Sequence, residues 1–389
     1  MSHVAIALFV AAAFGLLLHG LQLAAVVVHR RARAPLATRP TGISILKPLC
    51  GVDDDLARNL EQFAALDYAP FELLLGVRDR RDPAYPVAIG VARRHPRRVR
   101  VVLQREPVGL NPKVNQLATL ARAARYELLV VSDSNTRVAD GWLDEIGAHF
   151  EDARVGLVTH PVVGVGEARL GALLDNLHLT ASIGAGMIGA KRVVGQDVVV
   201  GKSMALRRGD LAELGGFAAL GDVLAEDYIL GRMVARTLEK RVVVARTVVL
   251  NVSQRRRVRD FFARYQRWSV IHRQAIGVRL YACEILLNPI AIAALATLVQ
   301  PRRVGAFAMV AVAKLAYEAA AVSLLRGGRP PWRLIYATPL KDALVAAAWA
   351  QGLWRREIDW RGSKLRVLAG TRLARPREFA RNSQSRAAA

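Results

Sequence analysis

Short apolar runs alternate with polar, helix-forming stretches between residues 41 and 255. Such alternation is typical of a mostly parallel β-sheet covered by helices, so we predict an α/β fold. The apolar runs that we interpret as strands are residues 43–46, 71–77, 99–104, 127–132, 155–164 and 241–250. A helix is expected to begin near the acidic residues 53–55. The sequence has no glycine-rich dinucleotide or P-loop fingerprint, so nicotinamide and ATP chemistry have little support.

Carboxylates follow two of these runs. Asp79 lies in GVRD after the second run, and Asp133 lies in VVSDSN after the fourth. The carboxyl ends of parallel strands form the ligand-binding edge of such a sheet, where a carboxylate can hold a divalent cation on nucleotide phosphates. Alternatively, D-S-N is good turn chemistry, and the arginines around Asp79 suit an exposed ion-pair cluster worth only about 0–1 kcal/mol.

Two further polar segments are candidates for the same site. Glu226 and Asp227 lie between apolar stretches in VLAEDYILG. Adjacent residues point to different sides of a helix, so we expect one acid to be catalytic and the other structural or solvated. The loop GLNPKVN contains Asn111 and Lys113, which are able to meet a nucleotide. The alternatives are an ordinary helix N-terminus for the acids and a polar loop before a helix for Lys113.

A basic-aromatic motif, R-Y-Q-R-W, occupies residues 264–268. Arg264 and Arg267 are three residues apart and share one helix face, and a guanidinium binds phosphate through two parallel hydrogen bonds. Tyr265 and Trp268 offer flat surface for a sugar ring or for a membrane interface. The surrounding sequence is basic and aromatic throughout, so a helix that rests on anionic lipid is the alternative interpretation.

The N-terminal segment predicts attachment to a membrane. Residues 4–28 carry no charge and are long enough for a span, which needs about 20 residues. The basic sequence HRRAR follows, so we predict a transmembrane helix whose C-terminal end lies in the cytoplasm.

Three more apolar stretches follow the sheet-forming region. Residues 283–299 and 304–325 are joined by a short linker and predict a hairpin. The second of them contains Lys314 and Glu318, which can pair on one helix face. Residues 334–353 include Lys341 and Asp342, so we expect this stretch to be interfacial or re-entrant.

Composition supports a membrane partner over a nucleic acid. The net charge is +24, from 56 Lys and Arg against 32 Asp and Glu, while 53% of residues are hydrophobic and the mean hydropathy is +0.22. These values favour binding to the anionic face of a membrane over binding to a nucleic acid. The sequence also contains no nucleic-acid-binding signature. The two cysteines, Cys50 and Cys283, lie far apart, which fits reduced cytoplasmic thiols and neither a disulfide framework nor a zinc site.

Taken in order, these motifs resemble the ceramide glucosyltransferases, which are inverting, family-2-like glycosyltransferases with a GT-A fold. The resemblance extends from about residue 44 to residue 268 and is weaker beyond. The segments that carry it are SILKPLCGVDDDLARNLEQFAALDY, GVRDRRDP, GLNPKVNQL, VSDSNTRV, GKSMALRR, GGF, AEDY and RYQRW. Bacterial relatives of this family use other lipids, including hopanoids, and other sugars.

The resemblance implies roles for individual residues. Asp79 corresponds to a uridine-site residue, Asp133 to the ligand of the metal and the diphosphate, and Asp227 to the general base. The remaining residues expected to bind the donor are Lys113, Arg264, Arg267 and Trp268. Because the second cluster reads D-S-N and not D-x-D, Asp133 is expected to be the only strong protein ligand of a Mg²⁺ or Mn²⁺ ion.

We therefore expect a multi-pass protein of a bacterial-type cytoplasmic membrane whose catalytic domain faces the cytoplasm. The expected parts are an N-terminal anchor (1–30), a GT-A catalytic domain (41–255), an interfacial helix (256–280), C-terminal membrane segments (281–355) and a basic tail (356–389). Residues 176–200, apolar and rich in glycine, are predicted to border the lipid acceptor.

The expected reaction moves glucose from UDP-glucose to the primary hydroxyl of ceramide. One alternative is the transfer of N-acetylglucosamine from its UDP-sugar to a hopanoid or another lipid. A non-enzymatic alternative is a membrane scaffold that binds anionic lipid, which leaves the acids that follow strands without an explanation. A polysaccharide synthase needs more pore-forming helices than this chain offers.

Overall fold

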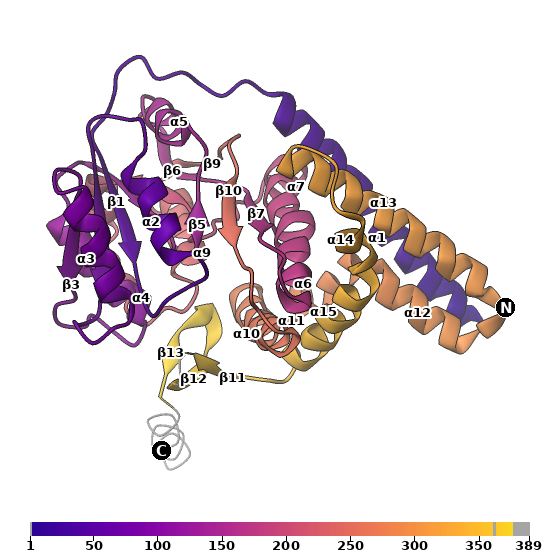
Figure 1. The fold of residues 1–389 in the computed structure, drawn as a ribbon. Helices are drawn as coiled ribbons and strands as arrows, with labels where there is room; N and C mark the ends of the chain where they lie inside the picture. Colours follow the sequence, from indigo (N-terminus) through magenta and orange to yellow (C-terminus); the bar gives the residue numbers. More distant parts are fainter. Residues whose placement is uncertain (1, 361–362, 376–389) are drawn as a thin grey trace, which may run out of the picture. The chain divides into compact units, whose positions relative to one another are not determined.

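The computed structural model of the chain describes residues 2–360 and 363–375. These residues form two compact units, and Figure 1 follows the chain through both. We call the first the sheet unit; it contains residues 29–166 and 190–254. We call the second the helical unit; its described residues fall within 1–28, 167–189 and 255–375. The last residues of the predicted basic tail, 376–389, lie outside the described part of the chain.

A seven-stranded sheet forms the centre of the sheet unit, in the order β3-β2-β1-β4-β8-β6-β9. Its strands are β1 (Ile43–Pro48), β2 (Phe71–Val77), β3 (Val99–Leu103), β4 (Leu128–Val131), β6 (Val155–Thr159), β8 (Met204–Arg207) and β9 (Arg241–Val244). Only β8 runs antiparallel to its neighbours, β4 and β6. The predicted α/β fold with a mostly parallel sheet is therefore confirmed.

Helices cover both faces of this sheet. Alternate strand residues point to opposite faces, so Ile43 and Ile45 belong to one apolar core and Leu46 to the other. The helices on the Ile45 side are α2 (Leu56–Ala64), α3 (Ala84–Arg94) and α5 (Trp142–His149). The helices on the Leu46 side are α4 (Pro112–Ala123), α8 (Arg208–Glu213), η2 (Phe217–Leu220) and α9 (Glu226–Arg236).

Two runs that the sequence predicts as single strands are each divided between two sheets. Residues 155–164 form β6 and β7 (Val162–Val165), and residues 241–250 are shared by β9 and β10 (Val249–Val252). β10 pairs with β7 and with β5 (Thr136–Arg137) in a second sheet.

A proline within the run explains the first break, and a contact from a distant glutamate explains the second. Pro161 separates β6 from β7, and proline cannot donate to a strand ladder. Between β9 and β10, the buried carboxylate of Glu145 accepts the backbone N–H groups of Arg246 and Thr247, which turns the chain out of the first sheet.

The helical unit combines three separate segments of the chain. Its helices are α1 (His3–Arg31, to residue 28), α6 (Leu170–His178), the π-helical turn η1 (Leu179–Gly184), α10 (Val258–Ile276), α11 (Val278–Cys283), η3 (Glu284–Leu287), α12 (Pro289–Val299), η4 (Pro301–Arg303), α13 (Val304–Arg326), α14 (Trp332–Tyr336), α15 (Thr338–Gly352) and η5 (Ala369–Thr371). The helix α7 (Ala185–Val194) continues from η1 and ends in the sheet unit.

Residues 167–189 thus interrupt the predicted catalytic domain of residues 41–255. They belong to the helical unit because α6 buries most of its side chains against α10 and α15.

The predicted tail contains a small antiparallel sheet, of which the sequence analysis gave no sign. Its strands are β11 (Glu357–Trp360), β12 (Ser363–Val367) and β13 (Leu373–Ala374). Ile358, Leu365 and Val367 are buried at alternate positions of these strands. This period-two pattern forms a strand face that the high content of arginine obscures.

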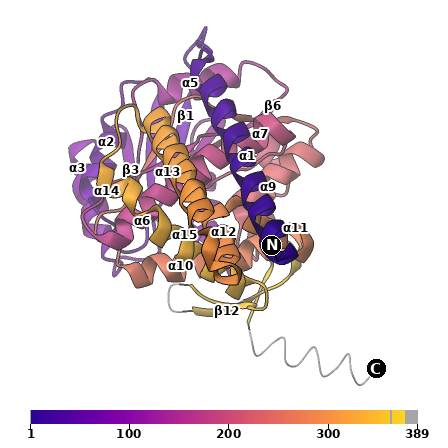
Figure 2. The same cartoon turned by 90° about the vertical axis from the view of Figure 1, so that its right-hand side faces the viewer.

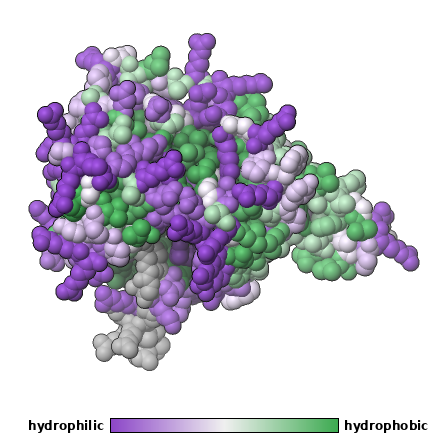
Figure 3. All heavy atoms as spheres, in the orientation of Figure 1, coloured by the Kyte–Doolittle hydropathy of each residue, from purple (hydrophilic) through white to green (hydrophobic). Residues whose placement is uncertain are grey.

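Two described helices are long and apolar enough to cross a membrane, namely residues 3–31 and 301–326. A third segment, residues 278–299, is broken between Leu287 and Pro289 and bends there by 81°. Figure 2 shows α12 and α13 as a hairpin beside α1, and Figure 3 shows apolar surface over this part of the helical unit. Exposed side chains on it include Leu298 and Met309, at 78% and 70% accessibility.

A buried ion network joins α13 to α15. The predicted pair is confirmed, since Nζ of Lys314 lies 2.8 Å from Oε1 of Glu318. Lys341 reaches the same oxygen at 2.5 Å and Oδ1 of Asp342 at 2.7 Å. Thr338 donates its hydroxyl to the other carboxylate oxygen of Glu318. All four charged side chains are nearly inaccessible, so each depends on its partners for compensation.

Replacing Glu318 with alanine is expected to destabilise the helical unit strongly. The change leaves two buried ammonium groups without their shared carboxylate, which costs about 3–5 kcal/mol. We expect the apparent Tm of the purified protein in detergent to fall by about 6 °C or more. Asp140→Ala, which replaces an exposed acid of the sheet unit, is the control and should change stability by less than about 1 kcal/mol. Equal stability of the two variants would contradict this account of the network.

Candidate active site

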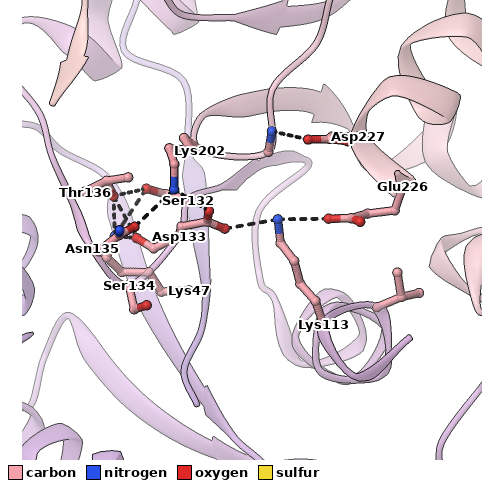
Figure 4. A network of polar contacts seen from close by, with 12 residues as sticks. Lys47, Lys113, Ser132, Asp133, Ser134, Asn135, Thr136, Lys202, Glu226 and Asp227 are labelled. Carbon is pink, nitrogen blue, oxygen red and sulfur yellow. Dashed lines mark hydrogen bonds and ion pairs between the residues drawn. The ribbon is translucent and has the colours of Figure 1, made fainter. Parts of the chain in front are cut away.

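Asp133 is the centre of a charged cluster at the carboxyl end of β4, as Figure 4 shows. Its Oδ1 lies 3.0 Å from Nζ of Lys113, and its Oδ2 lies 2.9 Å from Nζ of Lys202. The side chain keeps 26% of its accessibility, so the carboxylate remains open to a ligand. Charge-assisted contacts of this length are strong, and they fix the carboxylate between the two lysines.

The sheet register explains why Lys202 meets Asp133. β8 runs antiparallel to β4, and Met204 at the start of β8 pairs with Val131 at the end of β4. Two residues beyond this pair, the antiparallel register places Lys202 opposite Asp133. Nζ of Lys202 also donates to Oδ1 of Asn135 at 3.1 Å.

Lys113 comes to the site from the first turn of α4. Asn111 caps this helix, because its Oδ1 accepts the backbone N–H groups of Lys113 and Val114 at 2.9 and 3.2 Å. Pro112 occupies the first helical position, where a missing N–H does no harm. Besides Asp133, the Lys113 ammonium contacts Oε1 of Glu226 at 2.8 Å. The polar loop that the sequence indicated thus delivers a cation to the sheet edge.

Glu226 and Asp227 begin α9, and both lie at this cluster. Glu226 is almost inaccessible and holds Lys113. Asp227 is half-buried, and its Oδ2 accepts the backbone N–H of Gly201 at 2.6 Å. Both acids thus lie at one cluster, and the expected division into one catalytic and one structural acid stays a prediction. Lys113 and Gly201 approach the first turn of α9 from two directions, so one acid faces each.

Gly201 lies in close contact with two side chains of the cluster. A Cβ atom there would lie 2.5 Å from Nζ of Lys113 and 3.1 Å from Oδ2 of Asp227. Any side chain at this position would displace the lysine or the carboxylate. The absence of a side chain leaves room for both charged groups beside the backbone of Gly201.

A buried lysine beneath the cluster fixes the turn that carries Asp133. Lys47 on β1 is inaccessible, and its Nζ donates to the backbone carbonyl of Asp133 at 2.6 Å and to the hydroxyls of Ser132 and Thr136. Burial lowers its pKa well below the usual value, which outweighs the opposite effect of Asp133. Lys47 therefore acts as a hydrogen-bonding core residue of the S-D-S-N-T turn.

The lysines and carboxylates of the cluster set one another's protonation. Burial raises the pKa of Asp133, but Lys113 and Lys202 outweigh burial and hold that pKa below its usual range. Burial lowers the pKa of Lys113, but Asp133 and Glu226 outweigh burial and raise it. Burial raises the pKa of Glu226 by more than Lys113 lowers it. At neutral pH, an ionised Asp133 thus faces a protonated Lys113.

Asp79 shares this edge of the sheet with Asp133. β2 and β4 are parallel and flank β1, where Leu46 pairs with both Leu74 and Val131. Two strand spacings of about 4.8 Å each separate them, so the loops that carry the two aspartates emerge about 10 Å apart. Asp79 is exposed and accepts the backbone N–H of Arg81. Among the described residues it forms no ion pair, contrary to the arginine-cluster alternative.

The basic-aromatic motif belongs to the helical unit, on α10. Cζ of Arg264 lies 4.7 Å from the centre of the Trp268 ring, and Arg264 forms an ion pair with the buried Asp175. Arg267 and Trp268 are half-buried. The structure thus gathers Lys113, Asp133 and Asp227 in the sheet unit, while Arg264, Arg267 and Trp268 lie in the other unit.

Asp133 is a plausible ligand for a divalent cation only together with other oxygen donors. The described residues contain no group of three or more His, Cys, Asp and Glu side chains arranged around a metal. Mg²⁺ and Mn²⁺ prefer about six oxygen ligands, and both oxygens of Asp133 face ammonium groups. A diphosphate would supply oxygens for the cation and a new partner for a displaced lysine. The residues therefore fit a cation that binds together with a nucleotide.

Sequence reasoning missed three of the residues that build this cluster. Lys47, Gly201 and Lys202 all lie in segments that carry the family resemblance, but no role was assigned to them. Lys202 precedes an apolar run, MAL, whose antiparallel partner only the folded sheet reveals. Lys47 directly follows the predicted strand of residues 43–46 as a polar residue, and nothing in the sequence indicates that its side chain is buried.

A family model described as glycosyl transferase family 21 matches residues 7–373 of the chain. The chain belongs to this family. The resemblance to ceramide glucosyltransferases is thereby confirmed.

Two curated relatives are ceramide glucosyltransferases of other organisms. Ceramide glucosyltransferase 1 of Caenorhabditis elegans is 31% identical over 229 residues, which cover 58% of this chain and 49% of that protein. The ceramide glucosyltransferase of Komagataella phaffii is 28% identical over 204 residues, which cover 47% of this chain and 40% of that protein. The chain thus spans about half the length of the curated relatives it matches.

A solved structure of the same architecture is the mannosyltransferase PcManGT from Pyrobaculum calidifontis, in complex with GDP-Man and Mn²⁺. It aligns with a TM-score of 0.50 at 20% identity and covers 90% of this chain and 98% of its own. This likeness is one of fold, and it confirms the predicted GT-A architecture.

Removing Lys202 is expected to increase the affinity of the protein for Mn²⁺ in the absence of a nucleotide. Lys202→Met frees one oxygen of Asp133 from its ammonium partner, so the cation no longer has to displace a lysine. We expect the Kd for Mn²⁺, measured by titration calorimetry, to fall by at least about tenfold, which corresponds to 1.4 kcal/mol. Lys191→Met, which breaks a pair with Asp197 elsewhere in the sheet unit, is the matched control. An unchanged Kd in Lys202→Met would show that the lysines do not compete with a cation.

Proposed function

We propose that this chain is a membrane-bound inverting glycosyltransferase that moves glucose from UDP-glucose to the primary hydroxyl of ceramide. The observation that carries the proposal is that Asp133, Lys113 and Asp227 lie together beside Gly201, at the carboxyl edge of a GT-A sheet. Family membership and the names of the curated relatives support the reaction class and the substrates.

The cluster offers contacts for each part of the donor. Lys113 and Lys202 are positively charged and lie within 3.0 Å of Asp133, so a diphosphate placed there would gain two ammonium partners. Asp79 lies on a neighbouring loop of the same edge, which suits contact with the uridine. When bound to the diphosphate, Mg²⁺ or Mn²⁺ would neutralise charge on the leaving group, with Asp133 as its protein ligand. The PcManGT complex, which contains GDP-Man and Mn²⁺, supports a divalent cation and a nucleotide sugar in general terms.

Asp227 is the acid best placed to act as the general base. Figure 4 shows Asp133 on one side of Lys113 and both Glu226 and Asp227 on the other. Glu226 is inaccessible and occupied by Lys113, whereas the half-buried Asp227 accepts only backbone N–H groups among the described residues. Asp227 can therefore take a proton from an incoming hydroxyl without losing an ammonium partner.

The chemical step follows from this arrangement. The ceramide oxygen attacks the anomeric carbon of glucose and forms the new C–O bond, and its proton passes to Asp227. The bond between the anomeric carbon and the diphosphate oxygen breaks, and UDP leaves with the electron pair. Attack from the face opposite the diphosphate inverts the anomeric centre and gives a β-glycoside. The lysines stabilise the charge that develops on the departing UDP.

The apolar helices support a lipid acceptor and a membrane location. α1 and α13 are long enough to cross a bilayer, and α1 ends in His29, Arg30 and Arg31. Basic residues at a helix end are typical of the cytoplasmic side, so the catalytic domain is proposed to face the cytoplasm of a bacterial-type inner membrane. This topology places a soluble donor and a membrane lipid on the same side.

Asp227→Asn is expected to abolish transfer while UDP binding persists. The amide keeps the hydrogen bond from Gly201 but cannot accept a proton at neutral pH, so kcat should fall by at least about 10²-fold. UDP affinity, measured by titration calorimetry, should change by less than about threefold. Asp222→Asn, which alters an exposed acid five residues earlier, is the matched control and should keep normal turnover. Near-normal turnover of Asp227→Asn would eliminate the assigned base.

The substrates are tested by incubating the purified protein with a panel of UDP-sugars and lipid acceptors and identifying the products by mass spectrometry. We expect hexosylceramide from UDP-glucose as the main product, and NMR of its anomeric proton should report a β-linkage. A product that contains another sugar or another lipid would correct the substrate assignment. A folded protein that transfers no sugar to any lipid would overturn the proposed function.

A further inference from the structure

Asp175, which no sequence motif singled out, is the most heavily contacted carboxylate near the basic-aromatic motif. It lies on α6 with a fully inaccessible side chain. Nη1 of Arg264 lies 2.9 Å from its Oδ2 and 3.3 Å from its Oδ1, and the hydroxyl of Tyr265 donates to Oδ1 at 3.1 Å. Nε of Arg256 lies 3.2 Å from Oδ2. One buried carboxylate thus holds two of the five residues of the R-Y-Q-R-W motif.

The backbone geometry makes this contact close and rigid. Gly171 on α6 lies against the start of α10, and a Cβ atom there would be only 2.1 Å from the backbone carbonyl carbon of Arg257. His178, one turn after Asp175, packs edge-on against the ring of Tyr265 at 4.5 Å. α6 and α10 are therefore in close contact on both sides of Asp175.

The Tyr265 hydroxyl is a lasting hydrogen-bond donor to Asp175. Burial, reinforced by Asp175, holds the pKa of the Tyr265 hydroxyl well above its usual value, so the hydroxyl remains a donor at any physiological pH. Two guanidinium groups face one carboxylate, so the cluster keeps an excess positive charge.

Arg264 links Asp175 to Trp268. Its guanidinium lies between Asp175 and the ring of Trp268, at 4.7 Å from the ring centre, and its side chain is only 9% accessible. Tyr265 also contacts the Trp268 ring, at 5.4 Å between centres. Arg264 is committed to protein contacts on both faces, whereas Arg267 and Trp268 are more accessible.

We propose that Asp175 is a positioning residue for glycosyl transfer: it anchors Arg264 and Tyr265, which in turn hold the ring of Trp268 in place on α10. Arg264 is then a structural member of the motif and does not itself bind the donor diphosphate, which differs from the role that the family resemblance implies. This inference rests on the proposed function, because it assigns a role within the same transfer reaction.

The test compares the steady-state kinetics of Asp175 and Arg264 variants in the full-length protein. Asp175→Asn should lower kcat by about 10- to 100-fold, since small misplacements of a substrate-orienting group cost up to about 10²-fold. The KM for UDP-glucose should stay within about threefold. Asp175→Glu keeps the carboxylate and should recover part of kcat, which a loss of bulk packing alone does not explain.

A double-mutant cycle tests whether Asp175 acts through Arg264. Arg264→Gln should resemble Asp175→Asn in both kcat and KM. The double variant Asp175→Asn/Arg264→Gln should have a kcat no lower than that of the slower single variant, because both changes remove the same ion pair. If Asp175→Asn does not fold, the comparison of Asp175→Glu with Arg264→Lys carries the test in its place.

Glu72→Gln serves as the control for a general loss of stability. Glu72 is also a buried carboxylate, 3% accessible, and pairs with Arg100 at 2.7 Å. It lies near the start of β2, at the sheet edge opposite the one that carries Asp79. We expect its replacement to lower the Tm while the kcat and KM of the folded protein stay unchanged.

Three results would overturn the positioning role. These are an unchanged kcat in Asp175→Asn, additive losses in the double variant, or a tenfold or larger rise in the KM for UDP-glucose in Arg264→Gln with kcat intact. The last result would assign Arg264 to the donor directly. Failure of the proposed function is distinct, because it appears as an absence of transfer by the wild-type protein.

Discussion

The ion pairs that hold Asp133 between Lys113 and Lys202 are the interaction on which the candidate site depends. They bring together the end of β4, the first turn of α4 and the residues before β8, which are far apart in the sequence. Through Lys113, the same contacts reach Glu226 and the start of α9, where Asp227 lies. A single carboxylate thus fixes the two lysines that we propose for the diphosphate and, through Lys113, the helix that carries the proposed base.

The same pairing of one carboxylate with two cations recurs at two buried acids of the helical unit. Asp175 is held by Arg256 and Arg264, and Glu318 is held by Lys314 and Lys341. Basic residues outnumber acidic ones by 56 to 32, so this composition can supply two cations to one interior carboxylate. Burying an ion is costly unless it is paired and hydrogen-bonded, and this arrangement meets both conditions. Asp227, which accepts only backbone N–H groups among the described residues, is the contrast that supports its role as base.

The sequence predicts the parallel half of the fold well, and it fails where distant residues decide the structure. β1 to β4 follow from apolar runs bounded by polar residues, and the aspartates after β2 and β4 lie at the expected edge. The break between β9 and β10 was not predicted because the remote Glu145 causes it, whereas the break between β6 and β7 lies at Pro161, a local signal that the strand prediction overlooked. Lys202 and Asp175 escaped notice for a related reason. Their partners are set by the antiparallel register of β8 and by the packing of α6 on α10, which no local pattern encodes.

The most direct test of the account is the affinity for UDP-glucose with and without Mn²⁺, measured for the wild-type protein and for Asp133→Asn. If Asp133 holds a cation on the donor diphosphate, Mn²⁺ should tighten binding to the wild-type protein by at least about tenfold, or 1.4 kcal/mol, and should leave the variant unaffected. Equal dependence on Mn²⁺ in both proteins, or no binding of UDP-glucose by the folded wild-type protein, would contradict the central claim.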